Sequence, residues 1–166
     1  MQRLLILLVL TLAAPAKAED VSARQAFERL SALQGRWTGT FANGKTHSVE
    51  YRASAGGSAL IETWALSPTR ESITIYALDG DRLLATHYCP QGNQPRLEFK
   101  GVDDAGKYQF AFVDGTNLQN PEGWHQHAFW VRFDDETHYT RNETYVPNQG
   151  DAEAAAEEPV IYTRVD

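Results

Sequence analysis

The sequence contains a single cysteine, Cys89, so no internal disulfide can form and core packing must stabilise the fold. The 4 Trp, 7 Tyr and 7 Phe residues make a well-packed core plausible. Common catalytic signatures are also missing. There is no Ser-His-Asp order, glycine-rich phosphate loop, HExxH or CxxC pattern, so an enzyme would lack a recognisable set of catalytic residues.

Basic residues are few. Lys and Arg together number 15 against 22 Asp and Glu, and the formal net charge is −7. A surface of this charge repels nucleic acid and anionic lipid, so we expect neither as a partner.

The one long apolar run, residues 4–12, is shorter than the roughly 20 residues that a membrane-spanning helix needs. Arg3 precedes it, and Ala16-Lys17-Ala18 follows it as a small-x-small cleavage site. These features predict a signal peptide over residues 1–18, the alternative being a buried N-terminal helix. No cysteine follows the run that could carry a lipid. We therefore expect a periplasmic or secreted protein that is not inserted in the membrane after cleavage.

One segment, residues 23–33, has the apolar periodicity of an amphipathic helix. Ser22 and Gln25 have the spacing of a capping box, and residues 23–33 place apolar side chains on one face. Gly35 then ends the predicted helix. The apolar face consists of Ala23, Ala26, Phe27, Leu30 and Leu33. We expect the helix to bury this face against the rest of the protein.

From Arg36 onward the pattern alternates, as in β-strands. Turn signals such as Asn43-Gly44 and Gly56-Gly57 separate short strand candidates, which favours antiparallel neighbours in chain order. A meander of this length avoids bare edges by closing on itself. The sequence therefore predicts one all-β domain over residues 19–166, a closed up-and-down barrel of about ten strands with the helix capping one mouth. The predicted strands are 36–42, 46–54, 58–66, 71–78, 82–89, 95–101, 107–113, 124–133, 137–146 and 159–165.

A short helix followed by Gly35-x-Trp37 resembles the start of the calycins, the superfamily of lipocalins and fatty-acid-binding proteins. Further segments make the chain similar to a group of exported, lipocalin-like bacterial domains without an established activity. The resemblance covers nearly all of residues 25–145. It implies a barrel and an exported protein, and it transfers no catalytic residue. The segments are Gly57–Glu62, Tyr76-x-x-Asp79-Gly80-Asp81, Thr86–Cys89 and Gly92–Arg96.

Strand alternation also predicts which polar side chains face the lumen. In strand 124–133, His125 and His127 share a face with the apolar row Phe129, Val131 and Phe133. Similar reasoning on strands 58–66, 82–89 and 137–146 turns further polar groups inward. We expect the following residues to line a cavity and bind a ligand: Glu62, His87, Cys89, His125, His127, Arg141, Glu143 and Tyr145.

Each polar group has more than one interpretation. His125 and His127 fit one metal ion if His87, Glu62 or Cys89 supplied a third ligand. Histidines at this spacing on a strand are also commonly just hydrogen-bonded.

Cys89 and Arg141 also have two interpretations each. Cys89 near His87 suggests an activated thiol or a small buried apolar group. Arg141 with a tyrosine resembles the carboxylate clamp of fatty-acid-binding barrels, but an internal ion pair with Glu143 or Glu62 fits equally well.

The sequence thus predicts an exported barrel, monomeric or homodimeric, that binds a small molecule bearing a carboxylate or hydroxyls in a partly polar cavity. The alternatives are a metal- or haem-binding barrel, a small hydrolase or isomerase that uses cavity histidines, and a scaffold whose lumen is filled by its own side chains.

Overall fold

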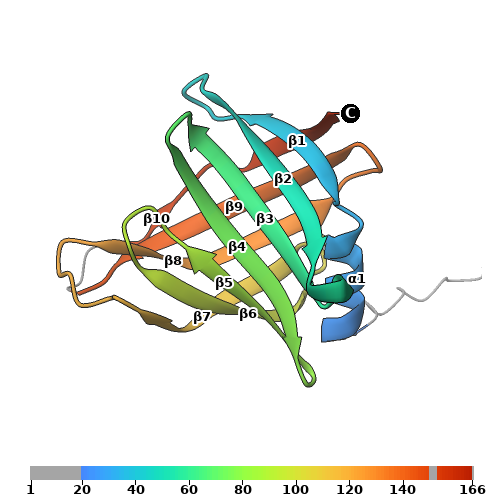
Figure 1. Cartoon of the computed structure of the whole chain (residues 1–166), viewed down its shortest axis with the longest axis horizontal. Helices are drawn as coiled ribbons and strands as arrows, with labels where there is room; N and C mark the ends of the chain where they lie inside the picture. The colour runs from blue at the N-terminus through green and yellow to red at the C-terminus, as the bar shows by residue number, and fades with distance from the viewer. Residues whose placement is uncertain (1–19, 150–152, 166) are drawn as a thin grey trace, which may run out of the picture.

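The computed structural model describes residues 20–149 and 153–165, and shows a barrel of antiparallel strands with a short helix at one end (Figure 1). The predicted signal peptide, residues 1–18, lies outside the described residues. The helix α1 spans Ala23–Ser31, and a 3-10 turn follows at Ala55–Gly57. The strands are β1 (Gly35–Thr40), β2 (Thr46–Ser54), β3 (Ala59–Ser67), β4 (Arg70–Asp79), β5 (Arg82–Tyr88), β6 (Gln94–Val102), β7 (Tyr108–Thr116), β8 (Trp124–Phe133), β9 (His138–Pro147), β10 (Ala155–Ala156) and β11 (Val160–Val165).

Ten of these strands close the barrel. Strands β1 to β9 pair antiparallel in sequence order, and β11 closes the cylinder by pairing with both β9 and β1. The two-residue strand β10 pairs with Thr144 and Tyr145 on β9, beyond the stretch that β11 covers. The predicted closed meander of about ten strands is therefore confirmed, with β10 as a small addition.

Helix α1 begins with the predicted capping box. The backbone N–H of Gln25 donates to Ser22 Oγ at 3.3 Å, and the backbone N–H of Ser22 donates to Gln25 Oε1 at 2.8 Å. The buried face of the helix packs against β4, β5, β2 and β6. The indole N–H of Trp37 donates to the Leu33 carbonyl at 2.7 Å, which ties the chain after the helix to the first strand. Helix α1 thus covers one end of the barrel (Figure 1).

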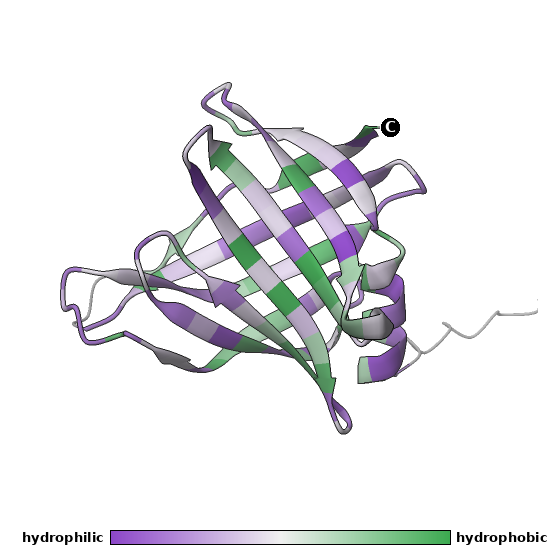
Figure 2. Cartoon of the chain, in the orientation of Figure 1, coloured by the Kyte–Doolittle hydropathy of each residue, from purple (hydrophilic) through white to green (hydrophobic). Residues whose placement is uncertain are grey.

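Apolar and polar residues alternate along the strands, as the banded colours of Figure 2 show. This alternation places successive side chains in the lumen and on the outside in turn. Towards α1 the lumen holds an aromatic cluster in which Tyr139 contacts Trp37 edge-on and stacks on Tyr162. Phe110 stacks on Phe129 at 4.4 Å between ring centroids on the other side. The described part of the lumen is therefore largely filled at the helix end.

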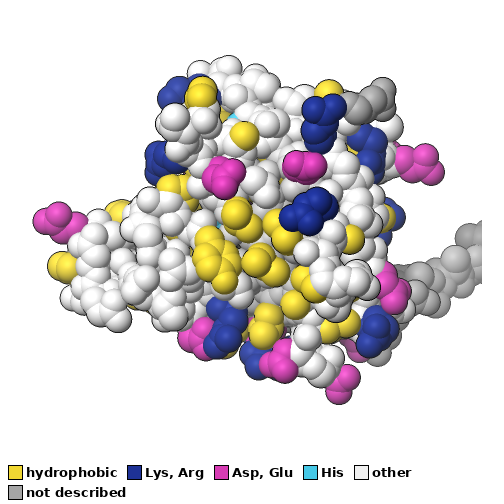
Figure 3. Space-filling model, in the orientation of Figure 1, with side chains coloured by type: hydrophobic (Ala, Val, Ile, Leu, Met, Phe, Trp, Pro, Cys, Tyr) yellow, Lys and Arg dark blue, Asp and Glu magenta, His cyan; other side chains and the backbone are white. Residues whose placement is uncertain are grey.

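The outer wall of β3, β4 and β5 also carries apolar side chains, seen as the yellow area in the middle of Figure 3. Ile61 faces Ile75, Ile73 faces Tyr88, and Ala77 lies opposite Leu84 in the neighbouring strand. These cross-strand pairs stabilise the sheet from outside. Among the described residues, no helix is long and apolar enough to cross a membrane.

Strand β8 departs from regular alternation, which corrects one prediction. Gln126 pairs with Tyr145 and Ala128 with Thr144, so His127 is an extra residue in a β-bulge. Gln126 is fully buried whereas His127 is exposed. The expectation that His125 and His127 share the inner face with Phe129 is therefore wrong, because sequence alternation cannot reveal a bulge.

Candidate functional site

A buried ion network occupies the middle of the lumen. Arg141 on β9 is 2% exposed, and its Nη1 lies 3.0 Å from Glu62 Oε1 on β3. Arg141 Nε donates to Glu143 Oε1 at 2.9 Å, and Nη1 donates to the hydroxyl of Tyr76 at 3.1 Å. The indole N–H of Trp64 donates a further hydrogen bond to the Glu62 carboxylate. Of the two interpretations of Arg141 offered by the sequence, the structure thus shows the internal ion pairs with Glu62 and Glu143.

The guanidinium of Arg141 has little left to offer a ligand. Two carboxylates face it, and its flat group lies over the Phe129 ring at 4.2 Å and near the Trp64 ring at 5.2 Å. Burial alone would lower the pKa of Arg141, but the facing carboxylates, Glu62 first, raise it well above its usual value. Arg141 therefore stays charged and acts as the fixed centre of the network.

Above this network lies a pocket of about 170 Å³. Its lining includes Arg70 after the β3–β4 turn and Pro90 and Gln91 between β5 and β6, at the barrel end away from α1 (Figure 1). Four of the predicted ligand-binding residues line it: His87, Cys89, Glu143 and Tyr145. Glu62 and Arg141 lie directly below, bonded to Trp64 and Glu143 in the pocket wall. We call this the mouth pocket, and its remaining lining residues are Phe41, Trp64, Leu66, Arg70, Ser72, Pro90, Gln91 and Glu157.

The floor of the mouth pocket is held by hydrogen bonds. Tyr145 donates its hydroxyl to Glu143 Oε2 at 2.8 Å, and this oxygen is the one that Arg141 does not occupy. Burial alone would raise the pKa of Glu143, but Arg141, His87 and the Tyr145 hydroxyl outweigh it and hold the pKa below its usual value. Glu143 is therefore a fixed, ionised acceptor.

His87 and Cys89 share the pocket but do not form an activated pair. His87 Nδ1 lies 3.0 Å from the Thr74 hydroxyl, and burial lowers the pKa of its imidazole. Burial likewise raises the pKa of the Cys89 thiol. A thiolate–imidazolium pair requires shifts in the opposite directions. The arrangement thus favours a neutral imidazole beside a neutral thiol, which suits binding better than nucleophilic attack.

His125 and His127 lie outside the mouth pocket. Both pack on Phe112, at ring-centroid distances of 4.7 and 5.5 Å, and His125 Nδ1 lies 3.0 Å from Asn148 Oδ1. The third ligands proposed from sequence sit around the mouth pocket and the ion network. Over the described ranges, no three His, Cys, Asp or Glu side chains come together in a group that could hold a metal ion.

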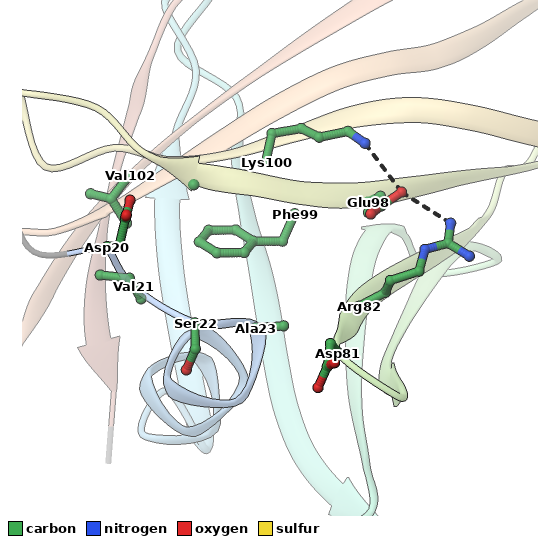
Figure 4. Close-up of a pocket in the computed structure, with 11 residues that line it drawn as sticks. Asp20, Val21, Ser22, Ala23, Asp81, Arg82, Glu98, Phe99, Lys100 and Val102 are labelled. Atoms are coloured by element: carbon green, nitrogen blue, oxygen red, sulfur yellow. Dashed lines mark hydrogen bonds and ion pairs between the residues drawn. The ribbon is translucent and has the colours of Figure 1, made fainter.

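A second hollow, of about 540 Å³, lies outside the barrel between the start of α1 and β6 (Figure 4). Its three charged residues on β5 and β6 pair with each other: Arg82 and Lys100 both contact Glu98, at 3.0 and 3.1 Å. Phe99 projects into the space between β6 and the start of α1. Since both of its cations are paired with Glu98 and its walls lie on the outer surface, this hollow offers a ligand less than the mouth pocket does.

Sequence reasoning missed several residues of the mouth pocket. Ser72 was detectable, because it alternates with Thr74 and Tyr76 on one face of β4, and all three are buried. Glu157 carried no such signal, since it lies between the short strand β10 and β11. Burial, and then the nearby Glu143, raise the pKa of the Glu157 carboxyl. The pocket therefore takes one acidic group from outside the regular strands.

Comparison with known proteins supports the fold. No protein-family model matches the chain, and no curated protein resembles it in sequence. Its structure is similar to the crystal structure of a protein of unknown function from the DUF3598 family of Nostoc punctiforme, with a TM-score of 0.51 and 13% identity. The likeness covers 81% of this chain and 48% of the other, so this chain matches about half of that protein. The chain is thus a β-barrel with a pocket that could bind a ligand.

Proposed function

We propose that this protein is an exported, lipocalin-like barrel that binds a small, uncharged polar molecule in the mouth pocket. The observation that carries the proposal is the pocket itself: hydrogen-bonding side chains surround a hollow whose floor is anchored by the buried Arg141 network. Sites that bind small molecules commonly combine a preformed hollow with a few fixed polar groups. The signal-like pattern of residues 1–18 and the calycin-like Gly35-x-Trp37 support export and the family resemblance.

The volume limits the size of the ligand. About 170 Å³ corresponds to the space that roughly five or six water molecules take up in the liquid, at ~30 Å³ each. This is below the roughly 300–1,000 Å³ of pockets that hold drug-sized molecules. A molecule, or the end of a longer molecule, with about six non-hydrogen atoms fits this space.

The charges limit its chemistry. Arg141 is already paired with Glu62 and Glu143, so it cannot act as the expected clamp for a carboxylate. Both oxygens of Glu143 already accept hydrogen bonds, one from Arg141 and one from the Tyr145 hydroxyl, which leaves little of this carboxylate for a cation to contact. Neutral His87 can donate or accept a hydrogen bond. The two other charged lining residues, Arg70 and Glu157, carry opposite charges, so the lining as a whole selects for neither sign. We therefore favour hydroxyl groups over a carboxylate as the recognised feature.

A titration with three small molecules of similar size and shape tests the preference for an uncharged ligand. The compounds 1,2-propanediol, lactate and 1-amino-2-propanol share a CH3–CHOH unit and differ in the charge of the third carbon's substituent. Binding is followed by NMR through the indole N–H signals. Trp64 lines the mouth pocket, whereas Trp37 lies near α1 and serves as the internal control.

We expect the diol to shift the Trp64 signal in a saturable manner at lower concentration than either charged compound, with Trp37 unmoved. The proposal fails if no compound shifts Trp64, or if lactate binds more tightly than the diol.

A further inference from the structure

Unpartnered polar atoms gather beside the mouth pocket, at the start of β8. Over the described residues, five buried side-chain polar atoms lack a hydrogen-bond partner, and four of them belong to Asn93, His125 and Gln126. Both amide atoms of Gln126 are among them, and its side chain is 0% exposed. A fully buried amide without any partner is costly, and native proteins usually supply one. Gln126 is thus the most exceptional polar side chain described.

The bulge of β8 places this amide next to the mouth pocket. Gln126 is the backbone partner of Tyr145, and residues directly opposite in antiparallel strands project to the same side of the sheet. Tyr145 lines the mouth pocket and bonds to Glu143 at its floor. Gln91, another lining residue, accepts a hydrogen bond from the backbone N–H of Trp124 at 3.1 Å. Gln126 therefore neighbours Tyr145 across the strand pair, and Gln91 lies close to the start of the strand that carries Gln126.

We propose that Gln126 is an inner subsite of the mouth pocket that recognises a carboxamide group of the ligand. This inference rests on the proposed function and specifies the class of its ligand. A primary amide can pair with another amide through two hydrogen bonds, one donated and one accepted. A carboxylate offers only acceptors and an ammonium only donors, so either would leave one amide atom of Gln126 unpaired. The proposal requires the Tyr145 side chain, whose residue pairs with Gln126, to move aside when the ligand binds, so that the subsite opens to the mouth pocket.

Lactamide is the matching probe, because it has the shape of lactate with a carboxamide in place of the carboxylate. We expect it to shift the Trp64 indole signal at concentrations about five- to tenfold lower than 1,2-propanediol does, as for one or two added hydrogen bonds. In Gln126→Met, which keeps the side-chain length without polar atoms, this preference should disappear while diol binding remains.

The stability of the protein without added compounds gives a second, independent readout. If the Gln126 amide is unpaired without ligand, Gln126→Met should raise the urea midpoint or leave it unchanged. If ordered water or the protein itself satisfies the amide, the midpoint falls and the inference is overturned. Gln126→Leu is measured alongside, so that a loss caused by the shape of the Met side chain is distinguished from a loss caused by the missing amide, which both variants would share.

The outcomes separate the two proposals. Diol binding at Trp64 without a preference for lactamide, or a preference that survives in Gln126→Met, overturns the subsite and leaves the proposed function standing. Failure of all four compounds at Trp64 overturns both.

Discussion

Arg141 and Glu62 form an ion pair across the lumen, with 3.0 Å between Nη1 and Oε1, although their strands β9 and β3 are not neighbours in the sheet. Both side chains are buried. The same guanidinium also binds Glu143, two residues further along β9, which lines the mouth pocket. The pair therefore links two walls of the barrel and fixes the floor of the mouth pocket.

Removing the cation should destabilise the protein strongly. In Arg141→Met two carboxylates remain buried without their partner, which typically costs about 3–5 kcal/mol of unfolding free energy. Urea denaturation followed by Trp fluorescence measures the change.

Arg82→Met is the matched control, because it removes an exposed arginine that pairs with Glu98 on the outer wall. Exposed pairs typically contribute about 0–1 kcal/mol. Similar losses in both variants would mean that the buried network does not stabilise the barrel.

Stability should also fall as the pH is lowered, in two steps. Burial lowers the folded-state pKa of His87 and His47 below the unfolded value of about 6.5. Below that pH the unfolded chain binds more protons than the folded one, so the free energy of unfolding decreases. The pKa of Glu143 is also lowered in the folded state, so a further loss sets in below about pH 4.3.

Urea midpoints measured from pH 8 to pH 3 test this dependence. His87→Gln should flatten the slope just below pH 6.5 and leave the step at lower pH in place. A midpoint that stays constant between pH 7.5 and pH 5 would contradict the burial of neutral imidazoles.

Sequence patterns predicted the barrel well because most strands alternate without interruption. In β5, for example, Leu83, Ala85 and His87 are buried as the period of two requires. The same logic placed Glu62 and Arg141 inside. It failed at His127, since the bulge shifts the inward position to Gln126. A bulge depends on pairing with another strand, which local alternation does not record, so the most unusual polar residue of the lumen was missed.

The single thiol provides a chemical probe of the mouth pocket. Cys89 is partly buried there, and burial raises its pKa, so the reactive thiolate is scarce. At pH 8, N-ethylmaleimide should modify the folded protein several times more slowly than the protein in urea. Mass spectrometry follows the single addition, and equal rates in both states would show that Cys89 is not held in the pocket.

Export gives a prediction about the N-terminus. When the full chain is produced in a Gram-negative host, we expect the purified periplasmic protein to begin at Glu19, after cleavage behind Ala18. Intact-mass measurement decides this. Recovery of the uncleaved chain from the cytoplasm alone would argue against a signal peptide.

The most direct test of ligand binding in the mouth pocket is the diol titration repeated on protein whose Cys89 carries N-ethylmaleimide. The added group fills space beside His87 and Tyr145, so we expect the saturable shift of the Trp64 signal to disappear while the Trp37 signal stays in place. An unchanged affinity of the modified protein for 1,2-propanediol would place the binding site elsewhere and contradict the proposed function.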